Sequence, residues 1–470
     1  MKKILSLLII LVGIYSCKRE NRNLESEIIG NKKAYKIDSL LTLLNSQEQF
    51  NGNVLIREKD TVILKKSYGL ANRKTKENLN ENSVFELASL SKQFTATGII
   101  LLAREKKISY EDKVTDYFPE LSFCNDVTIK NLLNHSSGIP EYFGLMMKNG
   151  DKSKTATNKD VIKVLSKNVD SLNFVVNDKF QYSNTNYLLL ASIIEKVTKM
   201  NYADFMEKNI FEPLNLKNTF IYNRRYKPQN IENYAYGYVL GDKQNITLPD
   251  SLSYLNYVTF LDGIVGDGMV NSTINDLKKW DESITKYKLI NPKEFEYLKK
   301  MDTLNNGEIN TYSFGWRFND SIMSHSGSWP GYVNYISRNL ISNDLIVILQ
   351  NYDEIVLPVK PIKEILENKS ISVSYKKEIQ LDSSILKEYE GEYYDSEDST
   401  SITKLTVGNN ALIFNSTNNP WDMPFYPDSK NTFFSKAPRM NIGFEFVEEN
   451  GITKLFFLQN NKQIGKSIKK

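Results

Sequence analysis

The pattern of apolar and polar residues predicts a chain in which strands enclose a long helical region. Residues 31–45 carry apolar side chains at helical spacing, and much of 127–287 repeats that spacing between loop segments. Residues 357–366 are typical of a closing helix. The strand-like runs lie at 53–57, 62–65, 314–318, 332–336 and 345–349. Because strands lie at both ends with helices between them, we predict an α+β fold whose antiparallel sheet joins distant segments.

The last part of the chain has a different pattern. A charged stretch at 367–383 is typical of a linker, and short strand-like runs then recur up to residue 470, separated by turns with Asn and Gly. The runs are 389–394, 402–407, 411–415, 432–435, 444–447 and 454–458. This spacing predicts a small antiparallel β-barrel over 384–470. The segment contains no His or Cys, and we expect it to be an accessory domain.

Composition excludes two classes of function. The formal net charge of the 470-residue chain is only +4, and no basic stripe interleaved with aromatic residues is present, so we expect no nucleic-acid partner. The chain has two histidines, His135 and His325, and lacks the His-Glu-x-x-His pattern of zinc hydrolases. We therefore expect no metal and no other cofactor.

The N-terminus resembles a bacterial lipoprotein signal over residues 1–17. Lys2 and Lys3 precede an apolar run at 4–14 that is too short to span a bilayer, and Cys17 follows as the residue to be acylated. Residues 18–32 would be a tether. We expect an exported, membrane-anchored protein that faces the periplasm or the cell exterior. Tyr15 departs from the small residue usual at its position, so ordinary secretion is the alternative.

The candidate chemistry begins at Ser89, which lies at the start of a predicted helix. Lys92 follows one helical turn later, and the apolar run 97–103 continues the helix. Residues three apart share a helical face, so the hydroxyl and the amine point the same way. Burial lowers the pKa of a lysine ammonium, and a neutral amine can accept the proton of a serine. Ser-x-x-Lys recurs at Ser283, Ser374, Ser384, Ser401 and Ser467. Only the copy at Ser89 opens a strongly apolar helix, which favours it as the nucleophile.

Two further short sequence motifs accompany Ser89-x-x-Lys92. Tyr182-Ser183-Asn184 precedes an apolar helical segment, and His325-Ser326-Gly327 precedes a strand-like run. With Ser89-x-x-Lys92 they resemble the three motifs of the serine β-lactamase and penicillin-binding protein superfamily, most closely its class C β-lactamase, DD-peptidase and esterase branch. The segments 131–138 and 266–273 are similar to further loops of that branch. The resemblance covers about residues 33–366 and implies a β-lactamase/transpeptidase-like fold, in which helices flank an antiparallel sheet and form a subdomain.

The resemblance also implies roles for the motif residues. Ser89 would be the acylated nucleophile, Lys92 would help to deprotonate it, and Tyr182 would be the partner base and the proton donor to the leaving group. Which of Lys92 and Tyr182 removes the serine proton stays open at this point.

The remaining motif residues would bind the substrate. Asn184 would hold a substrate amide, Gly327 would allow close backbone approach, and the amides of Ser89 and Ser328 would form an oxyanion hole. His325 occupies a position where many relatives carry Lys, and a largely neutral His disfavours an efficient β-lactamase. We interpret His135 as structural, with its side chain bonded within its own loop.

These residues predict a serine hydrolase that forms an acyl-enzyme. The favoured substrate is a small peptide or amide, as for a D-amino-acid peptidase or a DD-carboxypeptidase. A carboxylesterase or a class C β-lactamase acting on an ester or a β-lactam is the first alternative, and a catalytically silent binding lipoprotein is the second. The physiological substrate and the oligomeric state stay open.

Overall fold

The computed structural model describes residues 31–241, 245–353, 357–372, 375–398, 400–417, 419–436, 442–459 and 462–469. The predicted leader, Cys17 and most of the predicted tether lie outside these residues. Among the described residues, no helix combines the length and the apolar composition needed to cross a bilayer.

The core of the larger part is a seven-stranded antiparallel sheet whose strands come from the two ends of the region. The strand order is β12-β13-β14-β15-β16-β1-β2, and Gly52 of β1 pairs with Gln350 of β16. The strands are β1 (Gly52–Glu58), β2 (Thr61–Tyr68), β12 (Tyr312–Ser313), β13 (Trp316–Asn319), β14 (Ile322–Trp329), β15 (Tyr332–Asn339) and β16 (Leu345–Gln350). The predicted joining of distant segments into one sheet is confirmed.

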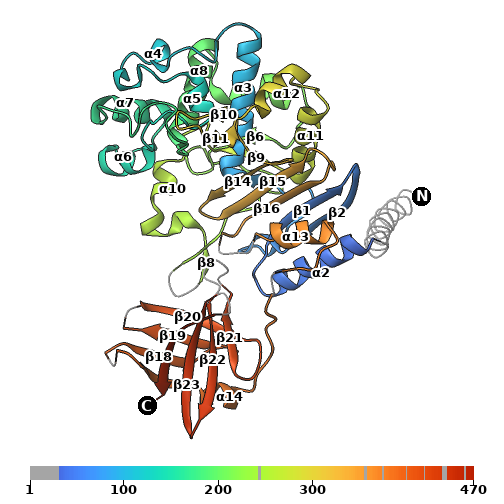
Figure 1. Ribbon diagram of the computed structural model, residues 1–470, viewed down its shortest axis with the longest axis vertical. Helices are drawn as coiled ribbons and strands as arrows, with labels where there is room; N and C mark the ends of the chain where they lie inside the picture. The colour runs from blue at the N-terminus through green and yellow to red at the C-terminus, as the bar shows by residue number, and fades with distance from the viewer. Residues whose placement is uncertain are drawn as a thin grey trace, which may run out of the picture.

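Both faces of the sheet are covered by other elements. Neighbouring residues of a strand point to opposite faces, so a strand that is buried on both faces contributes to two cores. In β16 every residue is buried; Ile346 and Ile348 face one core while Val347 and Leu349 face the other. The first core is closed by α2 (Lys32–Ser46) and α13 (Val359–Leu366), which lie together below the sheet in Figure 1. The second core lies under the helical part of the chain.

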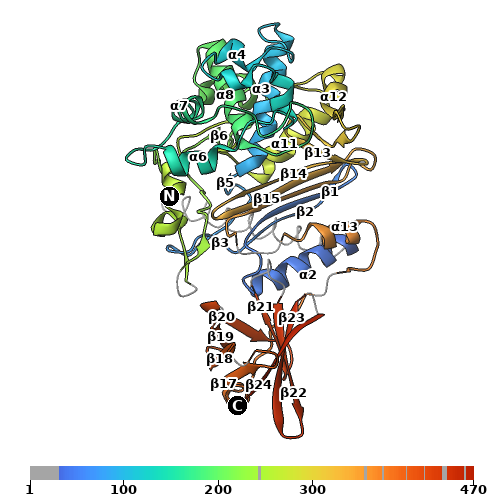
Figure 2. The same cartoon turned by 60° about the vertical axis from the view of Figure 1, so that its left-hand side comes forward.

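The helical part is built around two buried helices, α3 (Lys92–Arg104) and α8 (Asn184–Thr198). They approach closely at Gly98, where a methyl group would lie 3.0 Å from Ile194. The other helices are α4 (Val114–Tyr117), α5 (Ile129–Leu133), α6 (Tyr142–Asn149), α7 (Asn158–Asn168), α9 (Tyr202–Met206), α10 (Tyr257–Phe260), α11 (Ile274–Thr285) and α12 (Pro292–Lys299). Figure 2 shows these helices gathered on the opposite side of the sheet from α2 and α13.

Short strands connect these layers. The three-stranded sheet β5-β9-β6 lies beside the start of α3, and three two-stranded pairs lie in the loops. Their bounds are β3 (Leu70–Asn72), β4 (Glu77–Asn78), β5 (Phe85–Glu86), β6 (Phe220–Ile221), β7 (Val239–Leu240), β8 (Ile246–Thr247), β9 (Val270–Ser272), β10 (Asp302–Thr303) and β11 (Ile309–Asn310). The sheet β5-β9-β6 matters most for function, since β5 leads directly into the turn that carries Ser89.

The C-terminal part is a closed eight-stranded barrel, as the sequence predicted, preceded by α14 (Ser383–Glu388). Its interior is filled by aromatic and aliphatic side chains, among them Tyr393, Phe425 and Phe444. The strands are β17 (Gly391–Asp395), β18 (Ile402–Val407), β19 (Leu412–Ser416), β20 (Asn419–Pro427), β21 (Thr432–Ser435), β22 (Ile442–Glu449), β23 (Ile452–Gln459) and β24 (Lys462–Lys469). The pattern missed β20 and β24. β20 contains three prolines, which strands disfavour, and β24 is rich in lysine.

The segment between the two parts is bonded to the end of α2. Gln47 Nε2 donates to the carbonyl of Lys376 at 3.0 Å, and the amide of Glu378 donates to Gln47 Oε1 at 2.7 Å. Lys436 of the barrel forms an ion pair with Glu378 at 2.7 Å. The barrel is therefore attached on the sheet side of the larger part, away from α3 and α8 (Figure 1).

Candidate active site

Ser89 lies in a tight helical turn at the start of α3. The 3₁₀ turn spans Ala88–Ser91 and runs directly into the α-helix at Lys92. The turn is held against β9, because Ser91 Oγ accepts a hydrogen bond from the amide of Val270 at 3.0 Å. The predicted position of Ser89, at a helix N-terminus with Lys92 on the same face, is confirmed.

Lys92 has no exposed surface, and its amine has three neighbours. Nζ lies 3.1 Å from Ser89 Oγ, 2.8 Å from Asn184 Oδ1 and 2.7 Å from the carbonyl oxygen of Asp267. The amide and carbonyl oxygens can only accept, whereas the serine hydroxyl can also donate. When the amine is neutral, its two N–H groups stay with these two oxygens and its lone pair faces Ser89 Oγ. This arrangement suits proton transfer from the serine to the lysine.

The glycine-containing loop at 263–268 lies between α8 and the Lys92 amine. Gly266 has a φ of +103°, and a methyl group there would lie 2.4 Å from Ala191 Cβ. The loop therefore lies directly against α8. Thr95 Oγ1 donates to the carbonyl of Gly266 at 2.6 Å. These contacts hold the next carbonyl, that of Asp267, against the Lys92 amine.

Tyr182 and Asn184 belong to the loop that leads into α8. The Tyr182 hydroxyl is buried and has no hydrogen-bond partner among the described residues. The Lys92 amine lies 5.0 Å from the centre of the Tyr182 ring, and Asn184 Oδ1 accepts from Lys92. The structure thus brings the first two motifs together, and the phenol hydroxyl is left without a hydrogen-bond partner among the described residues.

His135 supports this loop, and its predicted bonding within its own loop is wrong. Its Nδ1 accepts from the amide of Ser183 at 3.2 Å, and its ring packs against Tyr182 with centres 4.3 Å apart. Burial lowers the pKa of His135 well below its usual value, and the charge of Lys92 lowers it further. The neutral ring fixes the Tyr182 loop through contacts between distant parts of the chain.

His325 lies in β14 as a neutral imidazole. Nδ1 lies 2.6 Å from the carbonyl of Ser326, which can only accept, so Nδ1 carries the proton. Nε2 then accepts from the Tyr312 hydroxyl at 3.0 Å. Burial lowers the pKa of His325 to about 3, with a smaller contribution from the charge of Lys92. This position supplies no positive charge near pH 7.

Gly327 lets β14 lie against the Ser89 turn. A methyl group at Gly327 would be 2.2 Å from the carbonyl oxygen of Leu87 and 3.2 Å from the amide nitrogens of Ser89 and Leu90. Ser328, the next residue, lines the same pocket as Ser89. The expected oxyanion amides, those of Ser89 and Ser328, therefore belong to two segments in direct contact. The strand that carries this motif was missed by the sequence pattern, which predicted strands only on either side of it.

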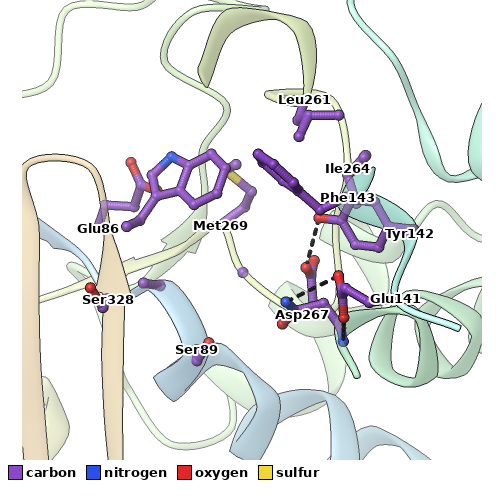
Figure 3. A pocket seen from close by; sticks show the side chains of 14 residues that line it. Glu86, Ser89, Glu141, Tyr142, Phe143, Leu261, Ile264, Asp267, Met269 and Ser328 are labelled. Carbon is purple, nitrogen blue, oxygen red and sulfur yellow. Dashed lines mark hydrogen bonds between the residues drawn. The ribbon is translucent and has the colours of Figure 1, made fainter. Parts of the chain in front are cut away.

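Several charged groups at the site were not singled out from the sequence. Glu86, Glu141 and Asp267 line the pocket that contains Ser89 (Figure 3). Arg317 is exposed, and its guanidinium lies 5.9 Å from the centre of the Tyr182 ring. Asp267 lies inside the segment 266–273, which carries part of the family resemblance and was the available signal. Glu86, Glu141 and Arg317 lie outside the motifs and loops that carry it. Among the described residues, no cluster of three or more His, Cys, Asp or Glu is arranged to hold a metal ion.

The fold and the buried lysine beside a partly exposed serine define the class of protein, a serine hydrolase. A family model described as Beta-lactamase matches residues 37–356. The chain is also 38% identical over 435 residues to penicillin-binding protein 4* of Bacillus subtilis (strain 168), covering 89% of this chain and 95% of that protein. The chain belongs to the beta-lactamase family.

Solved structures share the fold. The octameric penicillin-binding protein homologue from Pyrococcus abyssi is similar with a TM-score of 0.59 and 21% identity, over 95% of this chain and 99% of that chain. The D-amino acid amidase from Ochrobactrum anthropi SV3, in complex with L-phenylalanine amide, has a TM-score of 0.59 and 21% identity, over 72% and 99% of the two chains. The first of these likenesses extends over nearly the whole chain.

Proposed function

We propose that this protein hydrolyses amide bonds of small peptides or amino-acid amides through an acyl-enzyme on Ser89. The observation that carries the proposal is the environment of the Lys92 amine, in which two of three contacts are acceptor-only oxygens and the third is the Ser89 hydroxyl. A weakly acidic hydroxyl becomes a nucleophile when an adjacent base takes its proton.

The proposed reaction has two halves. Ser89 Oγ attacks the substrate carbonyl carbon as its proton passes to Lys92, and the oxyanion accepts hydrogen bonds from the amides of Ser89 and Ser328. The C–N bond then breaks, and the leaving amine takes a proton through Tyr182. Water then adds to the acyl-enzyme carbonyl and gives one proton to Lys92, the ester bond to Ser89 breaks, and Lys92 passes that proton to Ser89 Oγ. Each oxyanion donor is commonly worth about 3 to 4 kcal/mol in the transition state.

An amide or peptide substrate is favoured over a β-lactam by the state of His325. Its imidazole is neutral and both nitrogens are engaged, so it offers no charge to a substrate carboxylate. D-amino-acid peptidase activity fits this argument best, and the similar fold of a D-amino acid amidase is consistent with it. DD-carboxypeptidase activity also acts on a peptide bond, but its substrate ends in a carboxylate that another group would have to bind. Carboxylesterase and class C β-lactamase activities are the alternatives.

The test is intact-mass spectrometry during incubation with a penicillin, run beside hydrolysis of amide and ester substrates. Ser89→Ala should remove both turnover and any adduct while leaving the unfolding temperature near that of the wild type. Ser384→Ala, in an exposed copy of the same Ser-x-x-Lys pattern, is the matched control and should retain full activity. A stable adduct would indicate a penicillin-binding peptidase, and a short-lived adduct with loss of the antibiotic would indicate a β-lactamase.

Two outcomes would contradict the proposal. Substantial turnover by Ser89→Ala would show that another group is the nucleophile. Substrate binding by the wild type without any turnover or adduct would instead support a catalytically silent binding protein.

We further propose that the protein is exported and tethered to a membrane through a lipid on Cys17. Support comes from the sequence alone, where Lys2 and Lys3 precede an apolar run and the cysteine. Growth with an alkyne-bearing fatty acid should label the wild type and leave Cys17→Ser unlabelled. An unlabelled, secreted wild type would favour ordinary secretion.

A further inference from the structure

The pocket beside Ser89 has walls of two kinds. Fourteen residues line it (Figure 3), and apolar or aromatic side chains from four segments form one wall. These are Phe143, Leu261, Ile264, Met269 and Trp329. The charged residues of the lining are Glu86, Glu141 and Asp267, and the lining includes no Lys, Arg or His. The pocket therefore suits a group that is apolar in part and positively charged in part.

Glu86 is the least satisfied of the three acids. It is only 3% exposed, and among the described residues no hydrogen bond to its carboxylate is found. The nearby arginines have other partners, since Arg225 is bonded to Asp262 at 3.1 Å and Arg224 is paired with Asp250. A buried carboxylate without a donor costs free energy unless a ligand supplies one.

The other two acids line the same pocket and lie together, apart from Glu86 in Figure 3. Glu141 accepts from the amide of Asn184 at 2.6 Å, and Asp267 accepts from the Tyr142 hydroxyl at 3.0 Å. Burial raises the pKa of both carboxyls, and the charge of Asp267 raises the pKa of Glu141 further. The Lys92 amine is close to both, but it is already bonded to three neighbours. A ligand cation would relieve the repulsion between these acids.

A further cation near the nucleophile, Arg317, lies outside the lining of the pocket. The Arg317 guanidinium stacks over Phe180, Tyr182 and Tyr312 at 5.3–5.9 Å and does not line the pocket. Tyr182, the expected proton donor to the leaving group, does not line the pocket either. The acidic pocket is therefore on the side of the substrate portion that stays bonded to Ser89.

Resting on the proposed acyl-enzyme function, we propose that the acyl portion of the substrate carries a free ammonium group beside an apolar side chain. Glu86, Glu141 and Asp267 provide the negative surroundings for the ammonium, and the wall of Phe143, Leu261, Ile264, Met269 and Trp329 receives the side chain. The enzyme then selects amides and short peptides with an unblocked amino terminus.

The test compares two ligands that differ in one group. Phenylalaninamide, as each enantiomer, and 3-phenylpropanamide share the ring and the amide, but only the first carries an ammonium. Each is used to protect Ser89 of the full chain against labelling by a fluorophosphonate probe at pH 7, below the usual α-amino pKa of about 7.7 to 8.0, so that the amine is mostly protonated. We expect one enantiomer of phenylalaninamide to protect at a concentration at least tenfold lower than 3-phenylpropanamide does.

Variants assign the effect to the pocket. Glu86→Gln should reduce the tenfold difference between the protecting concentrations of phenylalaninamide and 3-phenylpropanamide. Glu207→Gln, which changes an exposed acid outside the pocket, should leave that difference unchanged. Because burial raises the pKa of Glu86 to about 7, the wild-type difference should also shrink at pH 6. The wild-type comparison decides the substrate class even where a variant fails to fold.

The two proposals fail in distinguishable ways. If the probe does not label Ser89 at all, the acyl-enzyme function falls and this inference falls with it. If Ser89 is labelled but the two ligands protect equally, or neither protects, the function stands and the ammonium preference is overturned. Stronger protection by 3-phenylpropanamide would overturn it as well.

Discussion

Gly327→Ala tests whether close contact between β14 and the Ser89 turn is needed for catalysis. The added methyl group would lie 2.2 Å from the Leu87 carbonyl oxygen, whereas ordinary contact begins at 3.4 Å. The strand and the turn must therefore separate by about 1.2 Å, and a displacement of about 1 Å at a reacting centre can cost about 10²-fold in rate. The obstacle is backbone, which cannot rotate away as a side chain can.

The expected result is a loss of about 10²-fold in kcat/KM with a folded protein. Overpacking of this kind typically costs about 1 to 3 kcal/mol, so the variant should unfold at a lower temperature but remain native under assay conditions. The assay is hydrolysis of a small activated ester together with the rate of Ser89 labelling by a fluorophosphonate. Circular dichroism checks that the fold is retained.

Gly144→Ala is the matched control. Gly144 lies in α6, and a methyl group there has no neighbour within 4 Å. The exposed helical position should gain up to about 1 kcal/mol from alanine, with no change in rate. A Gly327→Ala enzyme that keeps a rate within threefold of the wild type would refute the reasoning, because the separation would then not disturb the reacting geometry.

Three further predictions follow from burial and contacts. Glu86→Gln should raise the unfolding temperature more at pH 8 than at pH 5. The pKa of Glu86 is about 7 in the folded protein and 4.5 in the unfolded chain, so the wild type loses stability as the pH rises from 4.5 to 7. The loss in unfolding free energy is at most about 3 kcal/mol. An equal gain at both pH values would contradict this. Tyr312→Phe removes the donor to His325 Nε2 and should cost about 1 to 3 kcal/mol by denaturant unfolding, while Tyr297→Phe, whose ring is only half-buried, should cost less. Deletion of 384–470 should leave substrate range unchanged in steady-state kinetics, since the barrel does not line the pocket; an altered range would make the barrel part of the functional unit.

The sequence predicted those elements whose stability comes from their own pattern. The helix at 357–366 and the strand at 345–349 are recognisable because apolar side chains repeat at helical spacing or fill a short buried run. β14 was not recognisable in this way, because Ser326, Gly327 and Ser328 have little preference for a strand. Pairing with β15 holds it, with His325 opposite Ile336 and Gly327 opposite Asn334. Tertiary pairing overrides local preference here, at a strand that carries motif residues.

The residues of the candidate site also fall into those that the sequence indicated and those that only the fold brings together. Ser89, Lys92, Tyr182 and His325 were found because their motifs have a fixed order along the chain. Glu141 is near the site only because the loop before α6 packs against the start of α8, where it accepts from the Asn184 amide. Nothing in the local sequence around Glu141 distinguishes it from an ordinary surface acid. Its role depends on a contact between distant segments, which a single sequence does not display.

Glu86 connects the stability of the fold with the chemistry proposed for the pocket. A carboxylate that is 3% exposed and lacks a donor among the described residues is costly to bury, and glutamine at this position would avoid the charge. If the only role of Glu86 were structural, Glu86→Gln would increase stability at pH 8 and leave ligand selection unchanged. If the carboxylate receives a substrate ammonium, the same substitution increases stability and reduces the preference for the free amine. Measuring both the stability and the ligand preference of Glu86→Gln therefore separates the two roles. A packing role changes stability alone, whereas recognition of a cation changes stability and ligand preference together.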